Sequence, residues 1–338
     1  MSEDNLYETL QVSSRAEDEV ISAAYRALAK KYHPDIARDG DSRIKNLNEA
    51  HEILSDPARR WEYDKNRNAT MLDGKILGDR YRILERIATG GFGSTYKAEH
   101  VILGDLVCVK HRPQISMEAE KVLIEETKAI WDLRHFAIPA VRDLFRLDDG
   151  TLALVMSYIP GPTLEQVVNK AGCIDAENVA WITERILNAL KYLHYNAVVH
   201  GDLKPQNIIL QPESHSLTLV DYGMSSIKPT DNSTSKGFTD YFSPPEEVSG
   251  HTLLPESDFY GLGMTMIYML GGGYDHVKRR EVPVNLPGPM IDFIKRLIVR
   301  DVLARPNWGK EDLFETIKKI RFESFGREHS DMKTIPGF

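Results

Sequence analysis

The stretch His200-Gly-Asp-Leu-Lys-Pro-Gln-Asn207 decides the fold of this chain of 338 residues. A helical pattern from Ala176 to Asn196 precedes it, and the apolar run Ile208-Ile-Leu210 follows it. We therefore expect its polar side chains on a short loop that emerges from a folded core, which is the arrangement of a catalytic loop. Asp202 is placed to accept or orient the proton of an attacking hydroxyl group, and Lys204 to neutralise charge on the transferred group.

Two oxygen-bearing side chains near this loop are suited to a hard metal ion. Asn207 ends the loop, and Asp221 follows the predicted strand Leu217-Thr-Leu-Val220. Mg²⁺ binds oxygen ligands and completes its shell with substrate phosphates. We expect Asn207 to ligate one magnesium ion and Asp221 to bridge the metals between two phosphate groups of a substrate, with Mn²⁺ as an alternative metal.

A glycine-rich hairpin, a lysine and a glutamate add a nucleotide signal upstream. The glycines of Ile87-Ala-Thr-Gly90-Gly-Phe-Gly93-Ser-Thr95 lie between two predicted strands, where a hairpin can bring its backbone amides to phosphate oxygens. A plain tight turn uses the same residues, so the hairpin alone is a weak signal. Lys110 on the next predicted strand would hold the α and β phosphates, and Glu126 on the following helix would fix its ammonium group. Together these residues predict a phosphotransferase.

From Arg80 to Arg321 these motifs resemble the eukaryotic-type protein kinase domain. The resemblance implies a bilobal fold, with a β-rich lobe followed by a helical lobe. Lys204, two residues after the catalytic aspartate, is the serine/threonine pattern of this family. The resemblance also implies a buried ion pair between Glu246 and Arg305, and a brace for the catalytic loop at Asp258.

The same resemblance implies the nucleotide contacts. Met156 would be the gatekeeper, and Ser157 and Ile159 would form the hinge whose backbone binds adenine. Cys108 stands where the family usually has alanine over the adenine ring, so we expect the thiol to narrow the pocket. The full set of expected contacts is Ala88, Gly90, Gly91, Gly93, Thr95, Cys108, Lys110, Met156, Ser157, Ile159 and Ile209.

Gly201 is the main departure from the family, which has arginine beside the catalytic aspartate. That arginine pairs with a phosphorylated activation loop and orders it, so its absence removes the usual electrostatic receiver. We hypothesise that activity does not depend on phosphorylation of this loop. Hydroxyl residues nevertheless crowd the loop, at Ser225, Ser226, Thr230, Ser233, Thr234 and Ser235.

A second signature, His33-Pro34-Asp35, lies between two amphipathic helical patterns near the N-terminus. A three-residue match of this kind often occurs by chance, and a histidine before proline most often lies in a turn. Taken together, the tripeptide, the two helical patterns that flank it, Leu6-Tyr7 and Tyr63-Asp64 resemble a complete J domain. By that resemblance, the tripeptide and the basic residues of the preceding helix would dock on a DnaK-type chaperone and stimulate its ATPase. Those basic residues are Arg26, Lys30 and Lys31, for which a solvated helix face is the alternative.

Composition limits the other possibilities. A net charge of -8 and a pI near 5.8 argue against nucleic acid as a main partner. No apolar run is long enough to span a membrane, and the N-terminus is acidic and polar, so we expect a cytoplasmic protein. Cys108 and Cys173 lack the spacing of metal ligands and are too far apart in sequence to suggest a disulfide framework.

We therefore expect a multidomain α plus α+β chain. Its parts are a J domain of antiparallel helices at 1–68, a linker at 69–79, a bilobal kinase domain at 80–322 and a tail at 323–338. The polar, aperiodic stretch from Lys65 to Thr70 spans the boundary between the first two parts and is typical of a linker. The leading prediction is an ATP-dependent serine/threonine kinase that recruits a DnaK-type chaperone and acts on protein substrates. One alternative is a co-chaperone scaffold with a catalytically weak kinase-like domain, and another is a kinase whose J-like module only packs or dimerises.

Overall fold

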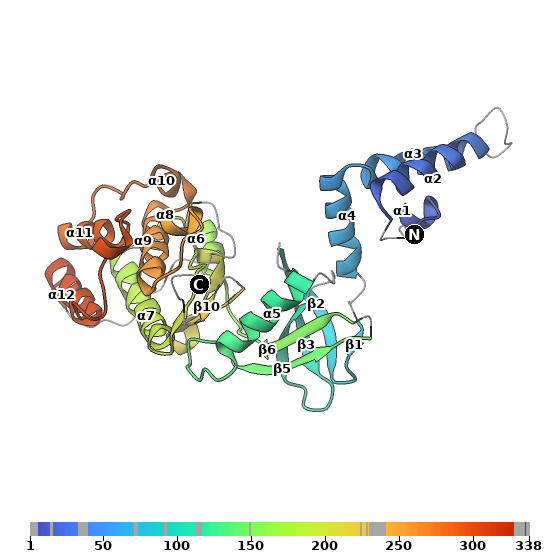
Figure 1. Ribbon diagram of the computed structural model, residues 1–338. Helices are drawn as coiled ribbons and strands as arrows, with labels where there is room; N and C mark the ends of the chain where they lie inside the picture. Colours follow the sequence, from blue (N-terminus) through green and yellow to red (C-terminus); the bar gives the residue numbers. More distant parts are fainter. Residues whose placement is uncertain are drawn as a thin grey trace.

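The computed structural model describes residues 6–13, 16–32, 40–70, 74–90, 93–111, 117–148, 150–223, 225–227, 229, 241–327 and 335. Its N-terminal region is helical (Figure 1), with α1 at Leu6–Thr9, α2 at Asp18–Lys31, α3 at Gly40–Leu54 and α4 at Pro57–Thr70. The tripeptide His33-Pro34-Asp35 lies outside the described residues.

The N-terminal helices have an apolar core of their own. Its buried members are Tyr7, Leu10, Ile21, Leu28, Leu47, Ala50 and Leu54, and they recur at the helical spacing of three or four residues on α2 and α3. Arg60 on α4 ties this helix back to α1 and α2, since it donates to the hydroxyl of Tyr7 at 3.0 Å and pairs with Asp18 at 2.9 Å. The Tyr7 hydroxyl in turn donates to Asp64 at 2.7 Å.

Helix α4 corrects one prediction. The polar stretch from Lys65 to Thr70, expected to be a linker, continues α4 as regular helix. The sequence of this stretch lacks apolar periodicity, but lysine, arginine and alanine have high helix propensity and an existing helix extends at low cost. The short strand β1 at Ile76–Leu77 also lies within the expected linker.

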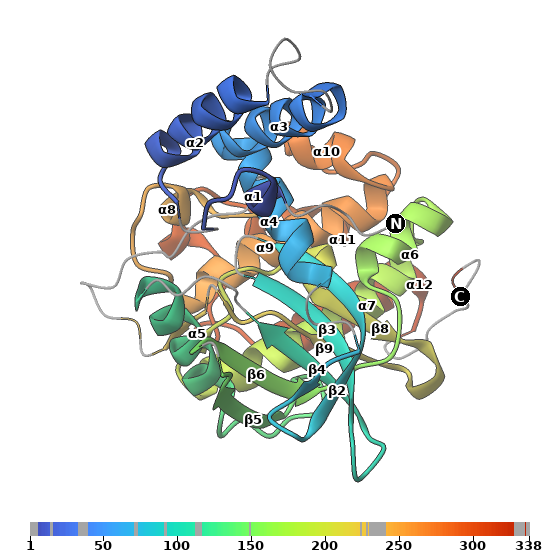
Figure 2. The same ribbon diagram turned by 90° about the vertical axis from the view of Figure 1, so that its right-hand side faces the viewer.

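An antiparallel sheet follows. Its strands are β2 at Tyr81–Gly90, β3 at Gly93–His100, β4 at Leu106–His111, β5 at Val141–Arg146 and β6 at Leu152–Ser157, in the spatial order β1-β2-β3-β4-β6-β5. Helix α5 at Met117–Ile130 lies beside β5 and β6 in both ribbon views (Figures 1 and 2). The predicted β-rich lobe is confirmed.

The rest of the chain is mostly helical. Its helices are α6 at Leu164–Ala171, α7 at Ala176–Tyr195, α8 at Pro245–Val248, α9 at Pro255–Gly271, α10 at Tyr274–Arg279, α11 at Gly288–Leu297 and α12 at Leu313–Phe325. Short strands lie between α7 and α8, namely β7 at Val198–Val199, β8 at Ile208–Gln211, β9 at Ser216–Leu219 and β10 at Ser226–Ile227. Single turns of 3-10 helix occur at η1, Pro205–Asn207, at η2, Pro212–Ser214, and at η3, Val302–Ala304.

Helix α9 is the centre of this lobe. Every residue from Glu256 to Leu270 is buried, because the helix is apolar around most of its circumference and neighbouring helices cover it. Asp175 caps α7 by accepting from the amides of Glu177 and Asn178, which fixes where the helix below the catalytic loop begins. These two helices meet beneath the loop that carries Asp202.

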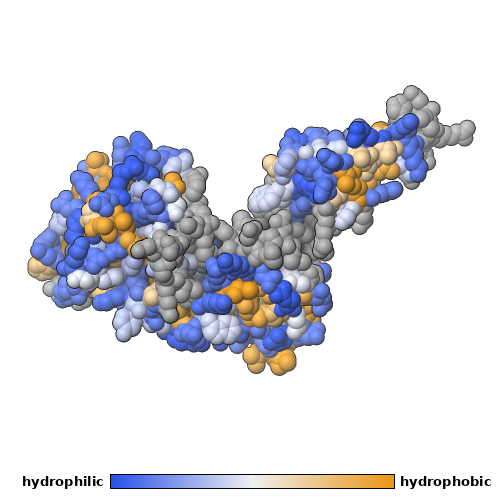
Figure 3. Space-filling view, in the orientation of Figure 1, coloured by the Kyte–Doolittle hydropathy of each residue, from blue (hydrophilic) through white to orange (hydrophobic). Residues whose placement is uncertain are grey.

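Hydrophilic residues cover most of the coloured surface in Figure 3, with smaller hydrophobic patches between them. Within the described part of the chain, no helix combines the length and the hydrophobicity that a membrane span requires.

Candidate active site

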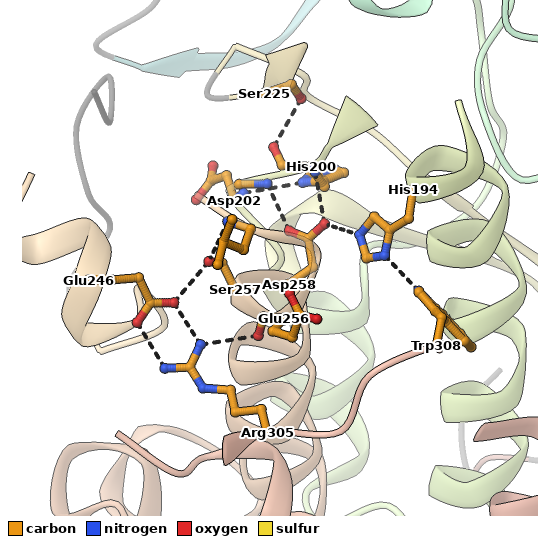
Figure 4. A network of polar contacts seen from close by, with 12 residues as sticks. His194, His200, Asp202, Ser225, Glu246, Glu256, Ser257, Asp258, Arg305 and Trp308 are labelled. Carbon is orange, nitrogen blue, oxygen red and sulfur yellow. Dashed lines mark hydrogen bonds and ion pairs between the residues drawn. The ribbon is translucent and has the colours of Figure 1, made fainter. Parts of the chain in front are cut away.

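The loop from His200 to Asn207 is held from below by Asp258, which lies on α9 and is 2% exposed. Its Oδ2 accepts hydrogen bonds from the backbone amide of His200 at 2.9 Å and from His194 Nε2 at 2.7 Å. Its Oδ1 accepts from the amide of Gly201 at 2.8 Å (Figure 4). Burial alone would raise the pKa of Asp258, but these donors lower it below its usual range. The predicted brace is confirmed.

Gly201 adopts a left-handed backbone, with φ of +74°. A side chain here would bring its Cβ close to the following carbonyl, at a cost of about 1 kcal/mol. Glycine therefore relaxes the turn that presents the Gly201 amide to Asp258, while it removes the arginine expected at this position from the family pattern.

Asp202 lies directly after this turn and is contacted by the two polar residues predicted beside it. Lys204 Nζ lies 2.7 Å from Asp202 Oδ2, and Asn207 Nδ2 donates to the same oxygen at 2.8 Å and to the Asp202 carbonyl at 2.9 Å. Asp202 and Asn207 are buried, and Lys204 is partly exposed. Because Asn207 directs its nitrogen at Asp202, its carboxamide oxygen is the end left to face a ligand.

An ion pair between Lys110 and Asp221 connects the two lobes at this site. Lys110 Nζ on β4 lies 2.8 Å from Asp221 Oδ1, although 111 residues separate them. Burial raises the pKa of Asp221, but the ammonium group of Lys110, the amide of Gly223 and the charge of Lys204 lower it to about 2. The carboxylate is therefore ionised at neutral pH. The side chain of Glu126, predicted to hold Lys110, lies outside the described residues.

The expected nucleotide contacts lie around Lys110. Gly90 pairs with Gly93, and Ala88 with Thr95, across the hairpin of β2 and β3, while Gly91 lies outside the described residues. Met156 and Cys108 are paired neighbours on β6 and β4, and Ser157 follows at the end of β6. Ile159 and Ile209 are partly buried, and Ile209 forms a bridge with Thr163 after the hinge segment.

The predicted ion pair between Glu246 and Arg305 is confirmed. Arg305 Nη1 lies 2.6 Å from Glu246 Oε1, and Nη2 lies 2.8 Å from Oε2, which is the bidentate geometry of the strong pairs. Arg305 also donates to the backbone carbonyls of Val299, Glu256 and Arg300, so the guanidinium joins α8 to α9 and to the segment after α11. Figure 4 shows this pair next to the Asp258 network.

Comparison with known proteins agrees with this geometry. A family model described as "Protein kinase domain" matches residues 81–310, which is more than half of the chain. The chain belongs to the protein kinase family. A second family model, "DnaJ domain", matches residues 5–64.

Three of the curated relatives are bacterial serine/threonine kinases. A probable serine/threonine-protein kinase of Clostridium perfringens is 29% identical over 77% of this chain and 42% of its own length. Serine/threonine-protein kinase B of Synechocystis is 30% identical over 68% of this chain and 42% of its own length. Serine/threonine-protein kinase PrkC of Bacillus subtilis is 32% identical over 60% of this chain and 32% of its own length. The matched regions span less than half the length of these relatives.

The residues of this kinase site fit ATP and a divalent metal. Protein kinases use both, and Asp221 and Asn207 offer the carboxylate and carboxamide oxygens that Mg²⁺ prefers. In the part of the chain that is described, no group of three or more His, Cys, Asp or Glu side chains forms a metal site. In phosphoryl transfer sites generally, nucleotide phosphates supply further ligands to the metal.

Several residues that contact the catalytic loop, or the side chains supporting it, carry no local signal in the sequence. Trp308 donates its indole N–H to His194, 114 residues earlier. Gln206 donates to Glu165 Oε1 and to the Tyr274 hydroxyl, both at 2.6 Å. Such partners lie far apart in sequence, so only an alignment of related sequences or the fold itself would reveal them.

Glu247 is a further residue that the sequence did not single out. It is 2% exposed and lies next to the predicted ion-pair residue Glu246. A small pocket below the catalytic loop is lined by Glu247 together with Asp202, Ser243 and Asp258. Burial is the main cause that raises the pKa of Glu247 to about 8, and the neighbouring carboxylates add to it.

The hydroxyl residues of the activation loop are only partly described. Ser225 is 1% exposed and donates to the carbonyl of His200 at 2.9 Å, so it supports the catalytic loop and does not present an accessible hydroxyl. Ser226 pairs with Val199 in the short sheet of β10 and β7. Thr230, Ser233, Thr234 and Ser235 lie outside the described residues.

The basic residues of the DnaJ region lie on the surface of α2. Arg26, Lys30 and Lys31 are all exposed. Arg26 and Lys30 are four residues apart and share one face of the helix, while Leu28 points into the core. The positions are those of a solvated face that a partner can reach.

Proposed function

We propose that this protein transfers the γ-phosphoryl group of ATP to serine or threonine hydroxyls of proteins, with Mg²⁺ as its metal, and that its DnaJ domain recruits a DnaK-type chaperone. The observation that carries the kinase part is the meeting of two residue sets at one point. Asp202, Lys204 and Asn207 form one set on the catalytic loop, and Lys110 and Asp221 form the other across the lobes. The two sets adjoin, since the charge of Lys204 acts on Asp221 and the amide of Val220 donates to the carbonyl of Asn207 at 2.9 Å.

Each of these side chains has a physical role in the transfer. Asp202 accepts or orients the proton of the substrate hydroxyl, and Lys204, 2.7 Å away, neutralises charge that develops on the phosphoryl oxygens. Lys110 binds the α and β phosphates. Asp221 and the carboxamide oxygen of Asn207 would hold the metal, which when bound neutralises phosphate charge.

The hinge and the hairpin would position the nucleotide. Cys108 and Met156 lie side by side on neighbouring strands, so the thiol and the thioether together would line the adenine side of the cleft. The backbone at Ser157 and Ile159 offers the donor and acceptor groups that adenine needs. Amides at Gly90 and Gly93 would reach the phosphates from the hairpin above.

We further propose that the kinase needs no phosphate on its activation loop. Asp258 binds the amides of His200 and Gly201, and Ser225 binds the carbonyl of His200, so hydrogen bonds within the chain hold the catalytic loop in place. Gly201 supplies no cation that would receive a phosphate.

The chaperone part rests on the DnaJ match and on the exposed basic face of α2. A DnaK-type ATPase is the partner that a DnaJ domain implies. Tethering that chaperone to the kinase domain would raise its local concentration at the catalytic site, up to the millimolar range for a short linker.

Phosphate transfer from magnesium and radiolabelled ATP tests the kinase part. Wild type, Asp221→Ala and the exposed control Asp148→Ala are each incubated with a general protein substrate, with and without a DnaK-type chaperone. We expect Asp221→Ala to lower the rate about a thousandfold or more, since it removes a ligand and a partner of Lys110, and Asp148→Ala to match wild type. Absence of transfer by folded wild type under every condition would reject the kinase proposal and favour a scaffold.

A further inference from the structure

The brace below the catalytic loop does not end at Asp258. Trp308, in the segment before α12, donates its indole N–H to His194 Nδ1 at 2.8 Å. His194 Nε2 lies 2.7 Å from Asp258 Oδ2, and Asp258 binds the amides of His200 and Gly201. Figure 4 shows these side chains in one continuous line that ends at the loop.

The direction of these hydrogen bonds follows from their chemistry. An indole N–H can only donate, so Nδ1 of His194 must be the acceptor and carry no proton. The proton of the neutral imidazole then lies on Nε2, where it is donated to Asp258. Trp308 therefore selects the tautomer and the ring orientation that Asp258 requires.

The orientation of the His194 ring matters for the loop, because Asp258 binds His194 and the loop amide of His200 through the same oxygen, Oδ2. As long as the Trp308 N–H is hydrogen-bonded to Nδ1, the imidazole keeps Nε2 turned toward Asp258. Asp258 is thereby held where its Oδ2 accepts from the amide of His200 and its Oδ1 from the amide of Gly201.

The His194 side chain is 3% exposed, and the Asp258 side chain 1% exposed, so water cannot replace a missing partner easily. Two neighbouring side chains also help to hold the indole of Trp308 in one orientation. Phe259 packs edge-on against the indole at 5.3 Å, and Lys191 Nζ lies 5.7 Å from its centroid.

We propose that Trp308 is a positioning residue for the catalytic loop, acting through His194 and Asp258. It acts through His194: it orients the imidazole that binds Asp258, and Asp258 in turn holds the backbone amides just before Asp202. The inference deepens the proposed kinase function and rests on it for its effect on turnover.

Trp308→Phe tests the proposal, because it removes the N–H and keeps a ring against Phe259. Trp181→Phe is the matched control: Trp181 is 2% exposed on α7, the helix that carries His194, and it loses the same atoms from the core. We expect Trp308→Phe to lower kcat about three- to tenfold with the KM for ATP within about twofold of wild type, and Trp181→Phe to change kcat less.

A second readout does not depend on catalysis. Hydrogen exchange of the His200 and Gly201 amides, followed by NMR on the full chain, should become about tenfold faster in Trp308→Phe and stay unchanged in Trp181→Phe. His194→Gln, which keeps an N–H donor for Asp258, should retain more activity than His194→Leu.

Equal kcat and equal amide exchange in Trp308→Phe and wild type would overturn the proposal, as would equal activity of the two His194 variants. An inactive but folded wild type would reject the kinase function instead. In that case, unchanged exchange in Trp308→Phe would still refute the role of Trp308 in holding the loop, and faster exchange would support it.

Discussion

Glu247 shows how a single buried carboxyl group can tie stability to pH. It lies below the catalytic loop near Asp202 and Asp258, two carboxylates that oppose its ionisation. A hydrogen bond with Ser243 favours the charged form but does not offset the loss of water. The group therefore keeps its proton at neutral pH, where an exposed glutamate would be charged.

This raised pKa gives a signed prediction for Glu247→Gln. The folded state holds the proton up to a pKa of about 8, whereas the unfolded chain releases it near the ordinary value of 4.5. Between these values unfolding releases the Glu247 proton, so the contribution of this group to the free energy of unfolding falls as pH rises, by up to about 1.4 kcal/mol per pH unit. Glutamine cannot titrate, so the variant should gain stability relative to wild type over this window.

Urea denaturation of the kinase domain within the full chain, at a series of pH values from 5 to 8.5, measures this difference. The exposed substitution Glu213→Gln is the control and should follow the wild-type curve. A constant difference between Glu247→Gln and wild type across the series would show that Glu247 is ionised in the folded protein.

At the scale of elements, one guanidinium joins parts of the helical lobe that are far apart in sequence. Arg305 pairs with Glu246 on α8 and binds carbonyls of Glu256, Val299 and Arg300. Its side chain is fully buried and that of Glu246 is 9% exposed. The two charges are therefore removed from water together, and each depends on the other for its neutralisation.

Arg305→Met should destabilise the kinase domain by about 3 to 5 kcal/mol, because it leaves the Glu246 carboxylate buried without its partner. Adding Glu246→Gln should recover part of this loss, since the amide carries no charge. Chemical denaturation of wild type, Arg305→Met, Glu246→Gln and the double variant gives a complete double-mutant cycle. Strictly additive losses would mean that the pair contributes no coupling free energy.

Much of this lobe was predictable because its signals are local. The periodicity between Ala176 and Asn196 gave α7 nearly to its ends, and the spacing of Asp202, Lys204 and Asn207 gave the geometry of the loop. Partners across the fold were not predictable in the same way. Lys110 contacts Asp221, and Trp308 contacts His194. Tertiary packing brings these residues together, and no local sequence pattern links the members of either pair.

At the scale of the whole molecule, the DnaJ region and the kinase lobes have separate apolar cores. The first core is formed by residues between Tyr7 and Leu54, and the cores of the lobes begin at Leu77. Helix α4 leaves the first core and extends to Thr70, past the predicted boundary at residue 68. Separate cores imply that each part can be disabled without unfolding the other.

His33→Gln and Asp221→Ala should therefore separate two activities of one chain. His33→Gln should abolish stimulation of a DnaK-type ATPase, because it alters the tripeptide that the DnaJ family uses for docking, and it should leave phosphate transfer to a general substrate within about twofold of wild type. Asp221→Ala should do the reverse. Both activities are measured on the full-length protein, one as phosphate release by the chaperone and one as radiolabel transfer.

The charge on α2 supplies a graded test of the same idea. Replacing Arg26 and Lys30 by glutamine removes positive charge from one exposed face without touching the buried Ile21 and Leu28, so folding should be preserved. Stimulation should weaken, and the loss should shrink at high salt, where screening already reduces the wild-type attraction. If both His33→Gln and the charge variant stimulate the ATPase like wild type, the DnaJ region does not act on the chaperone, and a packing role remains for it. A parallel loss of phosphate transfer would instead show that the two parts work as one unit.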